Sequence, residues 1–209
     1  GQGEGVRFPL PSGQHLLLYF HADKIGYATG MENPSPVPPH ATPGGRVTHL
    51  DHTLISAQNP QDDVKFLTEV LDFSLTEKVV DPAGNTLAAF LTCGHTMHDL
   101  AIGPGPDGHF HHMAFGMDSR TEVIHGVDLL KENAVPALEF GITRHGISGV
   151  TTIYFHDPSG NRNEFYNGAY LAPGAPGWVP PIVWQAEHFP RGAFYYENAV
   201  PEAFFAEVT

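Results

Sequence analysis

Apolar and polar positions follow the same order twice along the chain. The first series predicts a strand near 46–56, a helix beginning at Asn59-Pro60, and strands near 73–80, 86–93 and 97–102. The second series predicts a strand near 109–116, a helix beginning at Ser119, and strands near 137–143, 150–156 and 163–167. This internal repeat predicts two tandem βαβββ modules, at about 46–105 and 106–173, and hence an α+β fold.

Local signals support both predicted helices. Asn59 is expected to cap the first helix, with Pro60 in its first turn. The expected apolar stripe of this helix is Val64, Leu67, Val70 and Leu71. The second helix begins with the capping-box pattern of Ser119 and Glu122.

The two ends of the chain lie outside the repeat. Residues 6–19 predict two short strands joined by a Pro-Ser-Gly turn, and they match the end of the second module at a constant offset of 147 residues, with Leu17 at the position of Glu164. We therefore expect residues 1–22 to be the closing strands of a missing amino-terminal domain. Residues 23–45 are a proline-rich connector, and 174–209 are a tail expected to pack on the outside of the repeat or at a subunit contact.

Composition excludes several kinds of partner. The net charge of −13 would repel a nucleic acid and an anionic lipid surface. No apolar run has the roughly 18 residues that a membrane span needs. Cys93 is the only cysteine, so no intrachain disulfide can form, and we expect a reducing cytoplasm.

Two histidines and one carboxylate occupy matching strand positions. His52 and His112 each lie in the apolar first strand of a module, and Glu164 lies between β-formers in the last strand of the second module. An unpaired carboxylate is costly in such a place, and a metal would supply its partner. Two histidines and a carboxylate with open coordination positions form the facial triad of non-haem Fe(II) enzymes. The alternative from the residues alone is two packed histidines and a Glu164 paired with Arg144 or Arg162.

The segments TRHGI at 143–147 and TIYFHDPSGNRNE at 152–164 resemble the signature of extradiol ring-cleaving dioxygenases. The chain from about Leu50 to Thr209 is similar to the carboxy-terminal catalytic domain of catechol 2,3-dioxygenases, in the vicinal oxygen chelate superfamily. The resemblance implies an open, curved mixed sheet around a metal site. It also implies Fe(II) as cofactor, a catechol and O2 as substrates, a semialdehyde product and a homo-oligomer, commonly a tetramer.

The same resemblance implies a role for each site residue. It makes His52, His112 and Glu164 the iron ligands. It makes His98 a histidine beside the oxygen site, His145 the acid–base histidine, and Tyr154 a hydroxyl that contacts the substrate.

Two other functions remain open from the sequence. One is a glyoxalase-like isomerase on the same scaffold, which would need a fourth protein ligand such as His98. The other is a non-catalytic module that sequesters a flat aromatic molecule.

Overall fold

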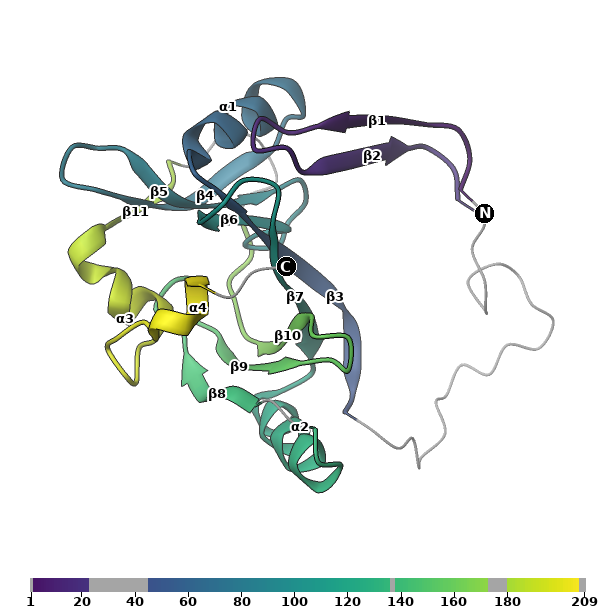
Figure 1. Ribbon diagram of the computed structural model, residues 1–209, viewed down its shortest axis with the longest axis vertical. Helices are drawn as coiled ribbons and strands as arrows, with labels where there is room; N and C mark the ends of the chain where they lie inside the picture. The colour runs from purple at the N-terminus through teal and green to yellow at the C-terminus, as the bar shows by residue number, and fades with distance from the viewer. Residues whose placement is uncertain (1, 23–44, 136–137, 173–179, 207–209) are drawn as a thin grey trace.

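Nine strands form the central sheet of the computed structural model, which describes residues 2–22, 45–135, 138–172 and 180–206 (Figure 1). The strands are β3 (Val47–Ala57), β4 (Ser74–Val80), β5 (Thr86–Thr92), β6 (Leu100–Pro104), β7 (Phe110–Met117), β8 (Leu138–Arg144), β9 (Thr151–His156), β10 (Arg162–Asn167) and β11 (Ile182–Gln185). Their order across the sheet is β11-β4-β5-β6-β3-β7-β10-β9-β8. The helices are α1 (Pro60–Val70), α2 (Arg120–Glu132), α3 (Phe189–Ala193) and α4 (Glu202–Ala206), with a 3-10 turn at Ala186–His188.

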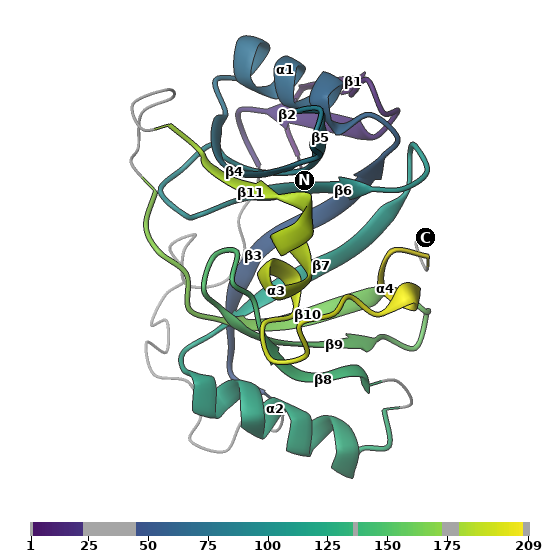
Figure 2. The same cartoon turned by 90° about the vertical axis from the view of Figure 1, so that its left-hand side faces the viewer.

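The repeat predicted from the sequence is confirmed. Each module is a strand, a helix and three strands, and in each the first strand pairs in parallel with the last, β3 with β6 and β7 with β10. The first strands of the two modules pair antiparallel, which makes one continuous sheet. The sheet curves so that the modules face each other across its open side (Figure 2).

Helix α1 begins as predicted but differs in two details. Asn59 is its N-cap residue, yet its side chain makes no capping bond and instead donates to Asp62 Oδ2 at 2.7 Å. Val64 and Leu67 are buried, whereas Val70 is 61 % exposed. The predicted stripe was therefore wrong at Val70, whereas Leu71, directly after the helix, packs against the same core as Val64 and Leu67.

The start of α2 and the start of β6 test the boundaries that local sequence signals predicted. The cap of α2 is confirmed, because Ser119 Oγ accepts the Glu122 N–H at 3.2 Å. The strand predicted from 97 begins only at Leu100. The reason is Asp99, whose carboxylate accepts bonds from the Thr92 hydroxyl, the Cys93 N–H and the Thr96 hydroxyl, and so extends the preceding turn.

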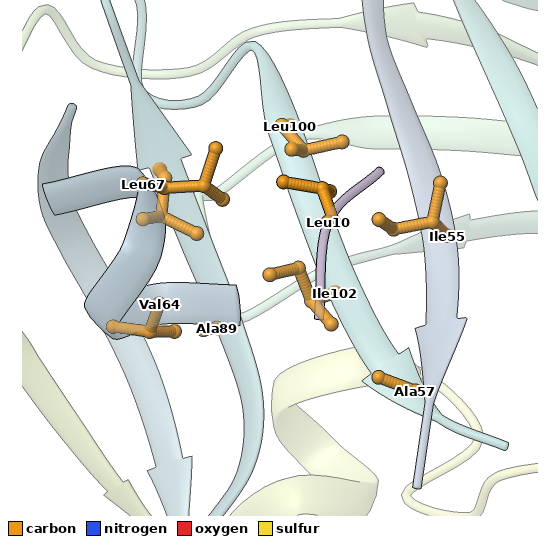
Figure 3. Packing of buried hydrophobic residues seen from close by; sticks show 9 residues of the cluster. Leu10, Ile55, Ala57, Val64, Leu67, Ala89, Leu100 and Ile102 are labelled. Atoms are coloured by element: carbon orange, nitrogen blue, oxygen red, sulfur yellow. The ribbon is translucent and has the colours of Figure 1, made fainter. Parts of the chain in front are cut away.

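The main apolar core lies between α1 and the first module (Figure 3). Val64 and Leu67 pack on β5 and β6, and Leu10 reaches the same cluster from the amino-terminal turn. Successive strand residues face opposite sides, so Ala89 and Leu91 join this core while Ala88 and Phe90 face the other way. That other face is where the candidate site lies.

The amino-terminal hairpin is a separate two-stranded sheet. Its strands β1 (Gly5–Pro9) and β2 (His15–Tyr19) pair antiparallel, as predicted, outside the nine-stranded sheet. Their origin as the closing strands of another domain stays a prediction. The proline-rich connector lies outside the described residues, apart from Gly45.

The described part of the tail packs across the open side of the sheet. Strand β11 adds to the sheet in parallel beside β4, and α3 and α4 lie between the two modules (Figures 1 and 2). No helix in the described ranges is long and apolar enough to cross a membrane.

Candidate metal centre and its pocket

Strand register brings the candidate ligands into one row across the sheet. His52 in β3 lies opposite Ala114 in β7, Ala114 lies opposite Glu164 in β10, and Glu164 lies opposite Tyr154 in β9. Residues opposite one another in a sheet point to the same face. His112 precedes Ala114 by two residues and therefore shares that face. The small side chain of Ala114 leaves space between the two histidines and the carboxylate.

The three candidate ligands converge in this space. Their ligand atoms all lie within 4.8 Å of one another. The Nε2 atom of His52 lies 3.3 Å from Glu164 Oε2, and that of His112 lies 3.1 Å from the same oxygen. Each side chain is at most 5 % exposed.

The donor set fits a metal ion. His112 Nε2 and Glu164 Oε2 are buried and make no hydrogen bond with any part of the chain that the structure describes. Buried polar atoms almost always have a partner, and both atoms point into the same space. A divalent cation would satisfy both atoms, leaving further coordination positions for a substrate.

Neighbouring side chains orient each candidate ligand. Asp51 Oδ2 lies 2.8 Å from His52 Nδ1, and His111 Nδ1 lies 2.7 Å from His112 Nδ1, so both ligand rings turn Nε2 toward Glu164. The Thr152 hydroxyl donates to Glu164 Oε1. Such partners commonly fix the ring orientation and tautomer of a metal-binding histidine.

Sequence reasoning missed these three partners. Asp51 and His111 directly precede the ligand histidines, and strand alternation sends adjacent side chains to opposite faces. A register shift in β3 between Leu50 and His52 accompanies the contact between Asp51 and the neighbouring ring. The only sign of Thr152 in the sequence was its position two residues before Tyr154, which puts both side chains on the same face of β9.

The three candidate ligands differ in how readily they carry charge. Burial lowers the pKa of His112 to about 4 despite the nearby Glu164. Burial also opposes charge on His52, but the adjacent carboxylates of Asp51 and Glu164 raise its pKa to about 9. Burial disfavours the Glu164 carboxylate, yet the surrounding imidazoles hold its pKa well below its usual range. The site is therefore arranged to hold an anionic Glu164 against a positive charge.

His145 and Tyr154 meet beside this centre. His145 follows β8, and its Nδ1 is fixed by the carbonyl of Ala193 in α3. The carbonyl accepts the Nδ1 proton, which leaves Nε2 as the acceptor for the Tyr154 hydroxyl at 2.8 Å. Burial, and then the charge of Glu164, raise the pKa of Tyr154 well above its usual value, so its hydroxyl stays protonated.

His98 lies beside the centre but outside the ligand group. Its ring centroid lies 4.0 Å from that of His52, and its Nδ1 faces Met97 Sδ at 3.0 Å. The group of three convergent ligand atoms found among the described residues does not include His98. All six residues singled out from the sequence thus surround one pocket.

The pocket above the centre is mostly apolar. Residues of the sheet and of its loops form its floor, and residues of the tail in and around α3 and α4 form its roof. The roof residues are Phe189, Gly192, Ala193, Phe204 and Phe205. The tail, which lies outside the repeat in the sequence, thus contributes five side chains or backbone positions to the lining of the pocket.

Comparison with known proteins identifies the family. The family model of the glyoxalase/bleomycin resistance protein/dioxygenase superfamily matches residues 49–165. The chain is 35 % identical to a metapyrocatechase of Pseudomonas sp. (strain CF600) over 212 residues, which cover 100 % of this chain and 67 % of that protein. The chain belongs to this superfamily.

Other relatives place the chain beside extradiol dioxygenases. It is 28 % identical to a manganese-dependent 2,3-dihydroxybiphenyl 1,2-dioxygenase of Geobacillus genomosp. 3, covering 94 % of this chain and 63 % of that protein. The 2,3-dioxygenase LapB of Pseudomonas sp. KL28 superposes with a TM-score of 0.77 at 37 % identity, covering 88 % of this chain and 63 % of that one. Homoprotocatechuate 2,3-dioxygenase of Arthrobacter globiformis superposes with a TM-score of 0.84 at 25 % identity, covering 100 % and 62 %. The chain spans about two thirds of these proteins.

Proposed function

We propose that this superfamily member cleaves a catechol with O2 in an extradiol reaction that depends on Fe(II). Residues 46–173 would form the catalytic domain, and His52, His112 and Glu164 would hold the iron. The observation that carries the proposal is the convergence of these three buried groups at the floor of an apolar pocket. The relatives named as metapyrocatechase and 2,3-dioxygenase support the same reaction class.

The bound metal would supply Lewis acidity and an open position next to the substrate oxygens. Of His145 and Tyr154, His145 is the better proton acceptor. Its Nε2 carries a lone pair, whereas Tyr154 keeps its proton and serves as a donor. His145 would accept a catechol proton and return it later, while Tyr154 would orient the substrate oxygen. His98, whose ring lies next to that of His52, would border the oxygen site.

The pocket supports a catechol without a charged substituent. Among the described residues that line it, none is Lys or Arg. An anionic substituent would be desolvated there without a partner, and this is costly. An uncharged ring, bare or with a small apolar substituent, fits Phe90, Ile102 and Ile147. We expect such a catechol to be turned over far better than 3,4-dihydroxyphenylacetate.

Anaerobic reconstitution tests the proposal. The metal-free protein is loaded with Fe(II) or, in parallel, with Mn(II), because one relative is named as manganese-dependent. Catechol and air are then added, and O2 uptake is followed together with formation of a yellow conjugated product. The proposal expects one O2 consumed for each ring opened, with Fe(II) the more active metal. Binding of catechol without O2 uptake would instead indicate an aromatic-binding module.

An isomerase function of the same superfamily predicts a different set of metal ligands. It would need a fourth protein ligand, and His98 is not part of the convergent group. Conversion of a thiol adduct of a ketoaldehyde without O2 uptake would support that function. We also propose a homo-oligomer that works in the cytoplasm, which gel filtration and localisation of the tagged protein would test.

A further inference from the structure

A second buried carboxylate lies away from the metal centre. Glu77 in β4 is 1 % exposed and belongs to the first module. Its Oε1 accepts the Ser148 N–H at 3.0 Å and the Tyr170 hydroxyl at 2.8 Å, and its Oε2 accepts the Trp184 indole N–H at 2.6 Å. All three of these donors are neutral, so directed hydrogen bonds hold this carboxylate.

The three donors come from separate parts of the chain. Ser148 lies in the loop between β8 and β9 of the second module, Tyr170 follows β10, and Trp184 lies in β11 of the tail. Trp184 is on the strand next to β4, so its bond reinforces local pairing. The bond to Ser148 is different, because it crosses from one module to a loop of the other.

That loop carries the acid–base histidine into the pocket. His145, Ile147 and Ser148 all line the pocket. Ser148 has a φ of 61°, a left-handed conformation that a non-glycine residue adopts only when its surroundings hold it. The Ile147 N–H also donates to Gly192 O at 3.0 Å, so the loop is fastened on one side by α3 and on the other by Glu77.

We propose that Glu77 is a positioning residue that holds the 145–148 loop, and with it His145, at the pocket. This inference rests on the proposed function for the role of His145. The fixed charge of Glu77 aligns the Ser148 N–H and stabilises its strained backbone. Without this bond the loop loses its anchor on the first module, and His145 loses its alignment with Tyr154.

Glu77→Gln tests the proposal, because it keeps the shape and removes the charge. A glutamine can accept at only one of its two ends, so its NH2 group must face an N–H donor, either that of Ser148 or that of Trp184. Replacing Trp184 by Phe removes one of the two N–H donors, so the glutamine can turn its NH2 group toward residue 184 and keep its oxygen on the Ser148 N–H. The double variant E77Q/W184F should therefore regain the turnover and the loop order that E77Q loses. If E77Q acted only through lost packing, the second substitution would not restore them.

The measurements use the full chain loaded with Fe(II). For E77Q we expect unchanged iron content, a kcat lower by at least about tenfold, since aligned proton transfer contributes about 100-fold or more, and a smaller change in KM. Hydrogen exchange should become faster in the peptide that covers 145–149. The double variant should return to within about threefold of wild type in kcat, as expected when coupled neighbours compensate.

Asp63→Asn is the matched control. Asp63 is also buried and accepts a backbone N–H, that of Ser12 at 2.9 Å, but it lies in α1 on the opposite face of the sheet. This variant should leave both kcat and exchange of the 145–149 peptide unchanged. Where E77Q gives no folded protein, Glu77→Asp keeps the charge but shortens the side chain, and it should show the same faster exchange.

Two results would overturn the role of Glu77. One is exchange of the 145–149 peptide at the wild-type rate in the Glu77 variant. The other is a double variant that is no better than E77Q. The exchange measurement does not need turnover, so it tests the loop anchor even if the wild-type protein fails to open catechol. That failure would count against the proposed function alone.

Discussion

Glu164→Gln is the most direct test of the metal centre. The substitution preserves the size of the side chain and removes its charge from a position that is 1 % exposed and within 3.3 Å of both candidate ligand histidines. Two unit charges 4 Å apart attract by about 4 kcal/mol at an effective dielectric constant of about 20, so a divalent ion and a carboxylate attract by about 8 kcal/mol. Desolvation of the carboxylate offsets several kcal/mol of this.

Removing the charge should therefore cost about 3–5 kcal/mol of metal-binding free energy, and each 1.4 kcal/mol is a factor of about ten in affinity. We therefore expect Glu164→Gln to bind Fe(II) at least about 100-fold more weakly than wild type. Competition against a chelator of known affinity, together with elemental analysis after gel filtration, measures this change. Glu77→Gln is the matched control, because it neutralises another buried carboxylate away from the ligands and should retain iron. Iron affinity within about threefold of wild type in Glu164→Gln would refute the assignment of this ligand.

Three further predictions follow from other parts of the structure. His145→Ala should keep its iron and lose about 100-fold or more of kcat, whereas the same change at the exposed His125 should alter neither, and loss of iron from the His145 variant would exclude the proton-transfer role. Leu67→Ala should lower the free energy of unfolding by about 2–5 kcal/mol in urea titrations, against nearly no change for Val70→Ala, and equal effects would contradict the described packing of α1. Before a metal binds, burial opposes charge on His52, but Asp51 and Glu164 raise its pKa to about 9, so a metal must displace one proton from it. The affinity for the metal should therefore rise about tenfold per pH unit from pH 7 to 9. Calorimetry in two buffers should detect the released proton at pH 7.

The modules and the candidate ligands could be predicted because they follow regular strand patterns. His52, His112 and Glu164 each lie within an apolar strand, where alternation fixes which face a side chain occupies. The register then aligns them without any information beyond the order of the strands. The same reasoning could not place Asp51 or His111, whose contacts depend on adjacent residues turning toward the same ring.

Contacts between distant segments were beyond the reach of local patterns. Nothing in the sequence around Glu77 indicates that its partners are Ser148 and Trp184, 71 and 107 residues away. The turn around Asp99 similarly replaced the start of a predicted strand with side-chain hydrogen bonds. In each case a polar side chain satisfied distant or irregular backbone groups, which hydrophobic periodicity does not report.

The roof of the pocket is built from a different stretch of chain than its floor. The candidate ligands are on β3, β7 and β10, whereas Phe204 and Phe205 come from a short helix near the carboxyl end. Substitutions in this helix can reshape the space above the ring without moving a ligand. Under the proposed function, replacing a few roof residues would therefore change which catechol fits the pocket and leave the candidate ligands on the sheet in place.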